Sequence, residues 1–307
     1  MNYQEVLQQV LFASGWSQEE LAQRIGVSFV TLNSWVNGKS KPTRETNKQA
    51  ISSLAAEILG ADVVDIALLQ KLKEDAVTHK LTANKLASNS NLLDKITLNL
   101  TYHTNTIEGS TMTISDVKEV LFDNKILSNR TQVEQREAIN HQVAMNFLLD
   151  ELIQNKNLQW TPDLIRNVHL RLMSGIISNA GIWRNHSVRI TGAHVPLANF
   201  IKIPELIENL CNQLNEESSD PVGLLARTHA EFEQIHPFSD GNGRTGRLIM
   251  FALALQYGLM PPIITRERRS AYYKYLEIAQ TKERFDLLEQ MLASEIIAIG
   301  ESMDSRV

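Results

Sequence analysis

The feature that most constrains the fold is a polar, glycine-containing segment, HPFSDGNGRTGR at residues 236–247, which lies between two apolar stretches. Residues 222–235 carry apolar side chains at helical spacing before it, and residues 248–255 read LIMFALAL after it. The second stretch is too apolar for a surface helix and predicts a buried one that ends near Gly258. The segment is therefore expected to be a loop that leads into the N-terminus of a buried helix.

Such a position suits an anion, because the first turn of a helix offers unpaired N–H groups and the positive end of the helix dipole. Gly241 and Gly243 allow the backbone to approach a ligand closely. Arg244 and Arg247 lie three residues apart on one helix face and add forked donors for phosphate oxygens. The segment therefore predicts a site for several phosphates.

Two further side chains indicate what is done to those phosphates. Asp240 precedes the glycines, where a carboxylate can hold a magnesium ion that bridges phosphate oxygens. His236 is the group able to accept a proton near neutral pH. A lone histidine or a GNG turn is usually structural, so the prediction of nucleotidyl transfer depends on the combination.

The segment resembles the signature of the Fic family, HxFx(D/E)GNGRxxR, and matches it at every specified position. The resemblance implies an all-helical core, Mg²⁺ as cofactor, ATP as substrate, and transfer of AMP to a Ser, Thr or Tyr hydroxyl of a target protein. It implies that His236 deprotonates the hydroxyl and that Asp240 holds the magnesium. Asn242 with its neighbouring backbone would contact the α-phosphate, and Arg244 and Arg247 the β- and γ-phosphates. The phosphorylating Doc branch carries Ala-Asn-Lys where this chain has Gly-Asn-Gly at 241–243, which favours AMP transfer.

A second string of the same family lies upstream. A helix over residues 92–107 is predicted to end at TNTIEG, in which Thr104 and Glu108 share a face and Gly109 stops the helix. Such a glutamate is ordinarily a solvated surface residue. The string, however, matches the inhibitory motif (S/T)xxxE(G/N) of Fic proteins. The resemblance implies that Glu108 pairs with Arg247 and so keeps it from the γ-phosphate.

Residues 187–195 are the best hairpin candidate of the chain, with Val188 and Ile190 alternating before a turn at Gly192. They resemble the Fic flap, which pairs with an extended segment of the target. The target-binding residues that we expect there are Arg189, Thr191, Gly192 and His194. His194 is equally well read as an ordinary turn residue, and Arg184 is a further candidate for contact with phosphate or target.

A helix over residues 270–279 carries Tyr272 and Tyr273, which line the adenine pocket under the same resemblance. An aromatic pair on an amphipathic helix is more often part of a core. His169 and His229 lie on predicted helices and are expected to be packed structural residues. The single cysteine, Cys211, is expected to be a buried thiol and excludes an internal disulfide.

Near the start of the chain, two short helices over 17–25 and 29–36 are predicted, capped by Ser17 and Ser28 and separated by a turn at Gly26. The stretch resembles the Xre-like helix-turn-helix family, which places the second helix in the major groove of double-stranded DNA. Val30, Leu32 and Trp35 are expected to face the core. The alternative is a helical protein-docking module. By analogy the family implies a homodimer. The predicted DNA contacts are Gln18, Ser28, Phe29, Thr31, Asn33, Ser34, Lys39 and Lys41, with Arg44 as a further phosphate contact.

The sequence therefore predicts an all-α protein with three parts: a helix-turn-helix domain at 1–60, a helical connector at 61–91, and a catalytic domain at 92–307 with the inhibitory helix at 92–109. A net charge of −5 argues against a protein coated in basic surface. No apolar run reaches membrane-spanning length, so no membrane and a cytoplasmic location are expected. The leading hypothesis is an autoinhibited adenylyltransferase that also binds DNA. The alternatives are an ATP-sensing transcriptional regulator with little catalysis and a hydrolase that removes AMP from a modified protein.

Overall fold

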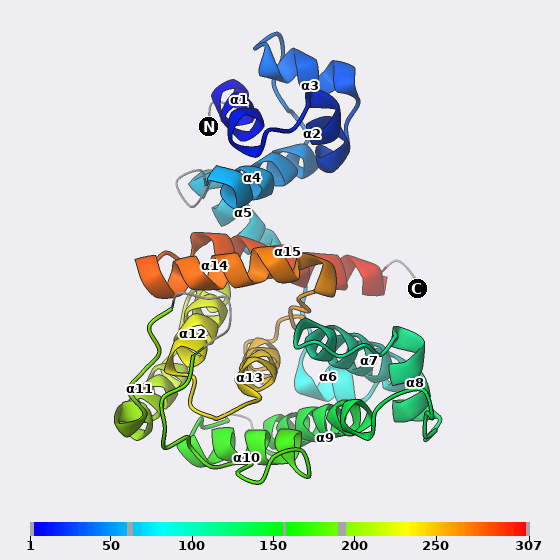
Figure 1. Cartoon of the computed structure of the whole chain (residues 1–307), viewed down its shortest axis with the longest axis vertical. Coiled ribbons are helices and arrows are strands. Elements are labelled where there is room, and N and C mark those ends of the chain that lie inside the picture. The colour runs from blue at the N-terminus through cyan, green and yellow to red at the C-terminus, as the bar shows by residue number, and fades with distance from the viewer. Residues whose placement is uncertain (1–2, 60–63, 156–157, 190–194, 305–307) are drawn as a thin grey trace. The chain divides into compact units, whose positions relative to one another are not determined.

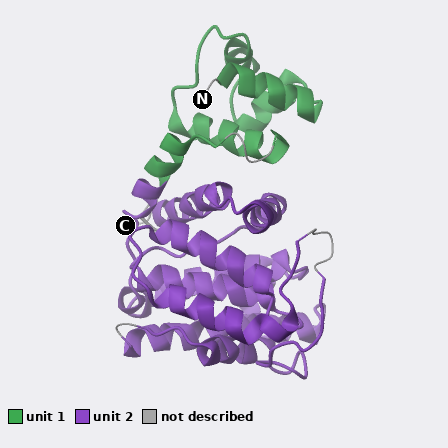
Figure 2. Ribbon diagram, turned by 90° about the vertical axis from the view of Figure 1, so that its left-hand side faces the viewer, with its two compact units in different colours: residues 1–72 green, residues 73–307 purple. Residues whose placement is uncertain are grey.

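The computed structural model of the chain describes residues 3–59, 64–155, 158–189 and 195–304 (Figure 1). In these ranges every regular element is a helix, which confirms the predicted all-α class. The chain divides into two compact units, Met1–Leu72 and Lys73–Val307 (Figure 2). The division lies within the segment 61–91 that the sequence assigns to a connector. None of the helices so described is long and apolar enough to cross a membrane.

The first unit is a small helical bundle around its own apolar core. Leu7, Leu21, Leu32 and Ile51 are at most 1% exposed at its centre. Its four complete helices are α1 (Tyr3–Ser14), α2 (Gln18–Ile25), α3 (Phe29–Val36) and α4 (Glu45–Leu59), and α5 (Ile66–Ala76) spans the division between the units.

The predicted helix starts in this unit are confirmed. Ser17 accepts a hydrogen bond from the N–H of Glu20, whose carboxylate accepts one in return, so the capping box is formed. Gly26 adopts a left-handed conformation with φ 78° between α2 and α3, and Ser28 caps α3. One prediction is wrong: Val30 is 75% exposed, because Leu32, Trp35 and Val36 supply the apolar face of this short helix.

The second unit is built around α13 (Asn242–Gln256), and every residue from 244 to 255 in it is buried. Figure 1 shows this helix at the centre of the unit, with α7, α9, α10 and α12 around it. The predicted buried helix is therefore confirmed. The surrounding elements are α6 (Ala83–Ala87), α7 (Ser90–Ile107), α8 (Ile114–Phe122), α9 (Gln132–Gln154), α10 (Pro162–Met173), η2 (Phe200–Lys202), α11 (Ile203–Asn215), α12 (Pro221–Ile235), η3 (Arg266–Arg268), α14 (Arg269–Lys282) and α15 (Asp286–Asp304).

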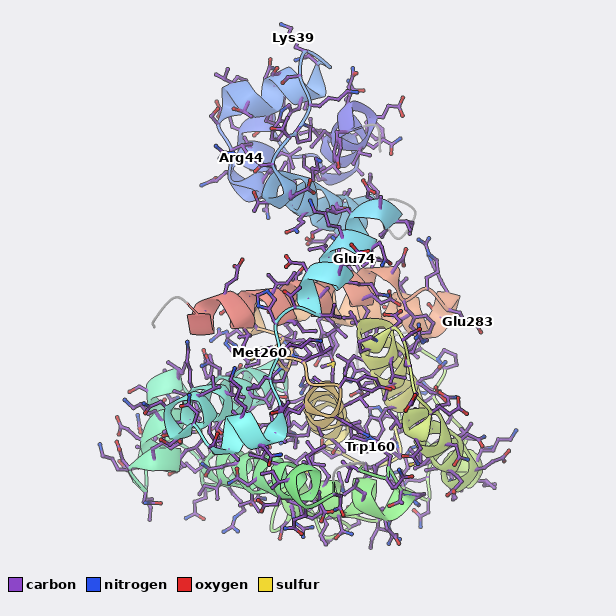
Figure 3. All side chains as sticks on the ribbon, turned by 180° about the vertical axis from the view of Figure 1, so that it is seen from behind. Lys39, Arg44, Glu74, Trp160, Met260 and Glu283 are labelled. Carbon is purple, nitrogen blue, oxygen red and sulfur yellow. The ribbon has the colours of Figure 1, made fainter. Side chains whose placement is uncertain are left out.

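Trp160 ties three segments of this unit together from the interior, where it is 1% exposed (Figure 3). Its indole N–H donates to Gln256 at the end of α13, and its backbone N–H donates to Asn215 at the end of α11. These bonds satisfy buried polar groups next to a large apolar ring. Cys211 is buried as expected, and burial raises the pKa of its thiol to about 12.

The described residues contain no strand of the hairpin that was predicted at 187–195. Residues 190–194, which include Thr191, Gly192 and His194, lie outside the described residues. The described flanks at 187–189 and 195–199 form no strand, and Arg189 is exposed. Ala198 on the second flank donates a backbone hydrogen bond of 3.1 Å to Gln234 of α12, so this flank runs along the end of that helix.

Candidate active site

The loop between α12 and α13 is fixed at both ends by left-handed residues. His236 follows α12 with φ 49° and ψ 60°, and Gly241 precedes α13 with φ 78°. Asn242 closes the loop from within, because its amide accepts a bond of 2.9 Å from Phe238 N–H and donates one of 2.9 Å to Phe238 C=O. The side chain of Asn242 is therefore committed to the loop, and what it offers an anion is the backbone of the first helical turn.

His169 of α10 supports this loop from below. Its ring stacks on Phe238 with centroids 3.5 Å apart. Its Nδ1 accepts the N–H of Gly181 at 2.8 Å, so Nε2 carries the proton and donates to the carbonyl of Asp240 at 2.9 Å. Burial lowers the pKa of His169 to about 4, which keeps the ring neutral at pH 7. The expectation that this histidine is a packed structural residue is confirmed.

Arg184 supports the loop from the other side. It is 3% exposed, and its guanidinium donates to the carbonyls of His236 at 2.7 Å, Ala198 at 2.7 Å and Ile235 at 3.2 Å. The suggestion that Arg184 contacts phosphate or target is therefore wrong, because its donors are already used by backbone carbonyls.

His236 is held with one ring nitrogen toward the protein. Its Nδ1 lies 3.2 Å from the carbonyl oxygen of Glu233, one turn back on α12. That contact places the proton on Nδ1 and leaves the Nε2 lone pair to accept a proton. Burial lowers the pKa of His236, against a smaller opposing effect of the Glu233 carbonyl, so the ring is neutral at pH 7.

His236 lines a cavity of about 370 Å³ together with residues from α13, α14 and the end of α7. Gly243 and Arg247 face this cavity from α13. Glu108, the residue that follows α7, faces it as well. The cavity therefore brings the histidine, the first turn of α13 and the predicted inhibitory residue into one space.

Glu108 lies directly over the first turn of α13. A Cβ atom at Gly243 would be only 2.2 Å from Glu108 Oε1, so only glycine leaves room for this carboxylate. A helix N-terminus attracts negative charge, and here a carboxylate of the chain itself lies over it. Glu108 reaches this position because α7 ends at Ile107 and Gly109 turns the chain with φ 107°.

Arg247 is bonded on all sides. It is 2% exposed, and it donates to Glu108 Oε1 at 2.5 Å, to the Thr104 hydroxyl, to the Thr104 carbonyl at 3.3 Å, and to the Tyr272 hydroxyl at 3.3 Å. Burial raises the pKa of Glu108, but Arg247 outweighs burial and the net shift is downward, so the pair is ionised at pH 7. Thr104 and Glu108, four residues apart, thus hold one guanidinium.

Arg244 is also paired inside the protein, since it is 4% exposed and donates to Glu137 of α9 at 2.5 Å. A second nitrogen lies 3.6 Å from Asp240. Contact with a phosphate therefore requires the guanidinium to share or exchange these carboxylates.

Asp240 is the metal ligand expected from the sequence, and its side chain is 61% exposed at the loop. Within the described residues, no group of three or more His, Cys, Asp or Glu side chains could hold a metal ion. A single accessible carboxylate fits Mg²⁺, which is commonly held by one or two carboxylates plus substrate phosphates and water. It does not fit zinc, which takes three or four protein ligands.

The two tyrosines on α14 differ. Tyr272 is fully buried beneath Arg247, and its hydroxyl lies 2.7 Å from His229 Nε2. Burial lowers the pKa of His229 to about 3, so this histidine is a neutral structural residue as expected. Tyr273 is 37% exposed and lines the cavity, where its aromatic face can stack on the base of a nucleotide.

In the first unit, the side chains expected to meet DNA are unevenly exposed. Ser28, Phe29, Lys39, Lys41 and Arg44 are exposed, and Figure 3 shows Lys39 and Arg44. Thr31, Asn33, Ser34 and Gln18 are partly buried, and Asn33 donates to Gln18 at 3.0 Å.

Three side chains of the site were missed or misread in the sequence. Glu233 lies behind His236, Glu137 holds Arg244, and Arg184 holds the loop. Glu233 could have been found, because it is three residues before His236 and shares its helix face. Glu137 and Arg184 reach the loop from distant segments and have no local pattern.

Comparison with known proteins gives two family matches: residues 159–254 match the Fic/DOC family, and residues 8–49 match a helix-turn-helix family. The chain is 32% identical over 181 residues to a protein named protein adenylyltransferase Fic from Drosophila ananassae, covering 58% of this chain and 36% of that protein. It is 34% identical over 186 residues to the protein of the same name from Nematostella vectensis, covering 58% and 42%. The chain thus spans about two fifths or less of these relatives.

Solved structures show the same fold. A Fic domain containing signaling protein from Bacteroides thetaiotaomicron superposes with a TM-score of 0.64 at 23% identity, over 76% of this chain and 95% of that one. A fragment of the C. elegans protein Fic-1 superposes with a TM-score of 0.68 at 20% identity, over 97% and 99%.

Proposed function

Because the chain contains a Fic/DOC-family domain at residues 159–254 and a helix-turn-helix domain at residues 8–49, we propose that it is a protein adenylyltransferase restrained by its own Glu108. The observation that carries the proposal is that His236, the first turn of α13 and Arg247 line one cavity. The name of the curated relatives supports the same activity.

The neutral ring of His236 accepts a proton at Nε2 from a hydroxyl of the target. The target oxygen forms a bond to the α-phosphorus of ATP as the bond from that phosphorus to the bridging oxygen breaks, and pyrophosphate leaves. The N–H groups of the first turn of α13 bind phosphate oxygens, with Gly241 and Gly243 allowing the approach. Arg247 and Arg244 bind the outer phosphates through forked hydrogen bonds.

Asp240 is the residue that would hold Mg²⁺ beside these phosphates. When bound, the ion supplies positive charge that neutralises the phosphate oxygens and the leaving group.

Restraint follows from the position of Glu108. Its carboxylate neutralises Arg247 and lies over Gly243, so negative charge stands where phosphate oxygens would be bound. Arg247 cannot direct all its N–H donors to a phosphate while it donates to Glu108 and Thr104. Release of Glu108 is therefore the step that makes the site competent.

We expect the change Glu108→Gly to raise the transfer of label from ATP labelled at the α-phosphate to protein, on the order of tenfold or more. The change His236→Ala in that background removes the label, because no group remains to accept the hydroxyl proton. A matched control is Glu216→Gly, which makes the same substitution at the exposed residue that ends α11. Equal labelling by wild type and Glu108→Gly contradicts the restraint, and labelling that survives His236→Ala contradicts the mechanism.

A second candidate is the removal of AMP from a modified protein, favoured by one observation. Glu108 faces the same cavity as His236, where a carboxylate can orient a water molecule. Loss of label from a premodified protein that depends on Glu108 supports this reaction. Absence of both transfer and removal, with ATP still bound, leaves a nucleotide sensor.

The first unit is proposed to bind double-stranded DNA. The start of α3 presents Phe29 and Val30, which are 45% and 75% exposed and can contact thymine methyl groups. Beside them is a cavity of about 460 Å³, whose lining includes Lys41, Arg44 and Asn47, and these side chains suit a phosphate.

A further inference from the structure

A buried carboxyl group lies behind the proposed base. Glu233 is on α12, one turn before His236, and it is 5% exposed. Its Oε1 has no hydrogen-bond partner among the described residues. Glu233 Oε2 lies 3.8 Å from His236 Nδ1, the ring nitrogen that the backbone carbonyl of Glu233 also contacts.

The groups that face Glu233 come from four elements. Arg247 on α13 and Glu108 after α7 act on the Glu233 carboxyl electrostatically, and Glu233 in turn raises the pKa of Tyr272 on α14. His236, the residue after α12, is the titratable neighbour of Glu233. His229 on α12 packs, like Glu233, against Gly246 of α13.

Gly246 of α13 has no side chain and so leaves the space that the Glu233 carboxyl group occupies. A Cβ atom there would lie 2.9 Å from Glu233 Oε1 and 3.1 Å from the His229 ring. The carboxyl group is thus held between α12 and α13 on the side of the cavity, which Glu233 also lines. A side chain at position 246 would fill the space that Glu233 occupies.

An unpaired buried carboxyl group destabilises the fold, because it has lost its hydrogen bonds to water and gained none in return. The cost is compensated if the group is used in another state of the site. Protonation of His236 at Nε2 creates that state, because the ring then carries a positive charge and a more acidic Nδ1–H. A shift of roughly 0.6 to 1 Å brings Glu233 Oε2 within hydrogen-bond distance of His236 Nδ1.

We propose that Glu233 is a positioning residue for His236. Its carboxyl group shares the Nδ1 hydrogen bond of the imidazolium ring with its own backbone carbonyl and stabilises the charged ring as the target hydroxyl gives up its proton. The inference rests on the proposed adenylyl transfer. The proton from the target stays on Nε2 and the ring proton stays on Nδ1, so Glu233 acts through the ring and does not touch the substrate.

The ionisation of Glu233 gives this role a dependence on pH. Burial raises the pKa of Glu233 to about 8, with Glu108 raising it further and Arg247 opposing. Below that pH the group is a neutral acid, and above it a carboxylate that raises the pKa of His236 and strengthens it as a base. Removal of Glu108 removes a negative neighbour, so in that background the Glu233 transition lies at lower pH.

The test uses the full chain with Glu108→Gly as parent. At a pH above the Glu233 transition, adding Glu233→Gln is expected to lower the rate of label transfer at saturating ATP roughly tenfold, a part of the 10² to 10⁴ typical of acid–base catalysis. The half-saturating ATP concentration is expected to stay constant, because nucleotide binding is not affected. The rise of rate with pH that the parent shows as Glu233 ionises is expected to be lost. Glu231→Gln, the same change two residues earlier on α12, is the control and leaves all three quantities unchanged.

A second measurement needs no catalysis. The His236 ring is followed by NMR in histidine-labelled protein as the pH is raised, and the parent is expected to show a change in its ring nitrogen shifts as Glu233 ionises, which Glu233→Gln is expected to remove. Glu233→Asp, which keeps the charge on a shorter arm, retains part of both effects and serves if the glutamine variant does not fold. An active parent whose rate, pH profile and His236 titration are all unchanged by the substitution overturns the inference alone. An inactive parent overturns the proposed function, while the titration still decides the role of Glu233.

Discussion

A single buried cation organises the loop that carries His236. Among the described residues, Arg184 has no carboxylate as a hydrogen-bond partner. It donates instead to carbonyls of His236, Ile235, Ala198 and His186. Burial lowers the pKa of this guanidinium, although it stays charged at pH 7. Because His236 is in a left-handed conformation that few non-glycine residues adopt, its backbone needs such external support.

We therefore expect Arg184→Lys to destabilise the chain by about 2–4 kcal/mol. Lysine keeps the charge but cannot reach four carbonyls with one ammonium group, so buried acceptors lose their partners. The free energy of unfolding in urea measures the change. Arg189→Lys, at an exposed position of the same segment, serves as the control and is expected to be neutral. Equal stability of the two variants would show that water replaces the lost donors.

The residues of the site that the sequence predicts are those fixed by local spacing. Arg244 and Arg247 share a helix face by their separation of three, and Thr104 and Glu108 share one by their separation of four. The placement of Glu108 on Arg247 came from family resemblance, and the structure brings the two together at 2.5 Å. Glu137, which lies 107 residues from its partner Arg244, depends on how α9 packs against α13 and has no local pattern.

At the scale of elements, helix starts carry much of the predictable information. Thr131 opens α9 with a capping box, and Thr161 caps α10, which has Pro162 at its first position. Helices such as α1, α8 and α11 were missed in the sequence, although α8 has a capping box at Thr113 and α11 has regular apolar spacing. The hairpin expected at 187–195 shows no strand in its described flanks, because alternation in a short segment is weak evidence for a strand.

The start of α9 also joins two elements, and this makes its stability depend on pH. Glu134 accepts hydrogen bonds from Thr131 at the cap and from the N–H and hydroxyl of Thr111 before α8, the latter at 2.7 and 2.8 Å. Burial raises the pKa of Glu134, but these bonds outweigh it and lower the pKa to about 2. The group is therefore more stable as a carboxylate in the folded chain than in the unfolded chain.

A depressed pKa contributes stability that is present above the unfolded value, about 4.3, and is lost as pH falls toward 2. We expect Glu134→Gln to lower the free energy of unfolding by about 1 kcal/mol at pH 7, after allowance for solvent screening. The difference from wild type is expected to shrink steadily between pH 5 and pH 3 in urea titrations. Asp150→Asn, at an exposed carboxylate of the same helix, is the control. A difference that stays constant with pH would show that the hydrogen bonds do not depend on the charge.

At the scale of the whole molecule, the two proposed activities belong to different units. Thr104, Glu108, His236 and Arg247 all lie between residues 73 and 307, and the helix-turn-helix lies between residues 1 and 72. The first unit has a closed apolar core of its own. In the second unit, Lys73 pairs with Asp220 at the cap of α12 and with Glu289 of α15, so the end of α5 is part of the catalytic unit. Each unit thus has what it needs to fold alone.

The last prediction is that the two activities separate when the chain is divided with α5 kept in both fragments, residues 1–76 and 66–307. The fragment 1–76 is expected to bind a duplex library of random sequence with the same salt dependence as the full chain, because that slope counts phosphate contacts. The fragment 66–307 is expected to keep the ratio of labelling between Glu108→Gly and wild type, because the restraint lies wholly within it. Fluorescence anisotropy at several salt concentrations and transfer of labelled AMP measure the two. If 66–307 is fully active without the substitution, the first unit takes part in the restraint, and if 1–76 does not bind while the full chain does, the DNA contact is not a property of the helix-turn-helix unit alone.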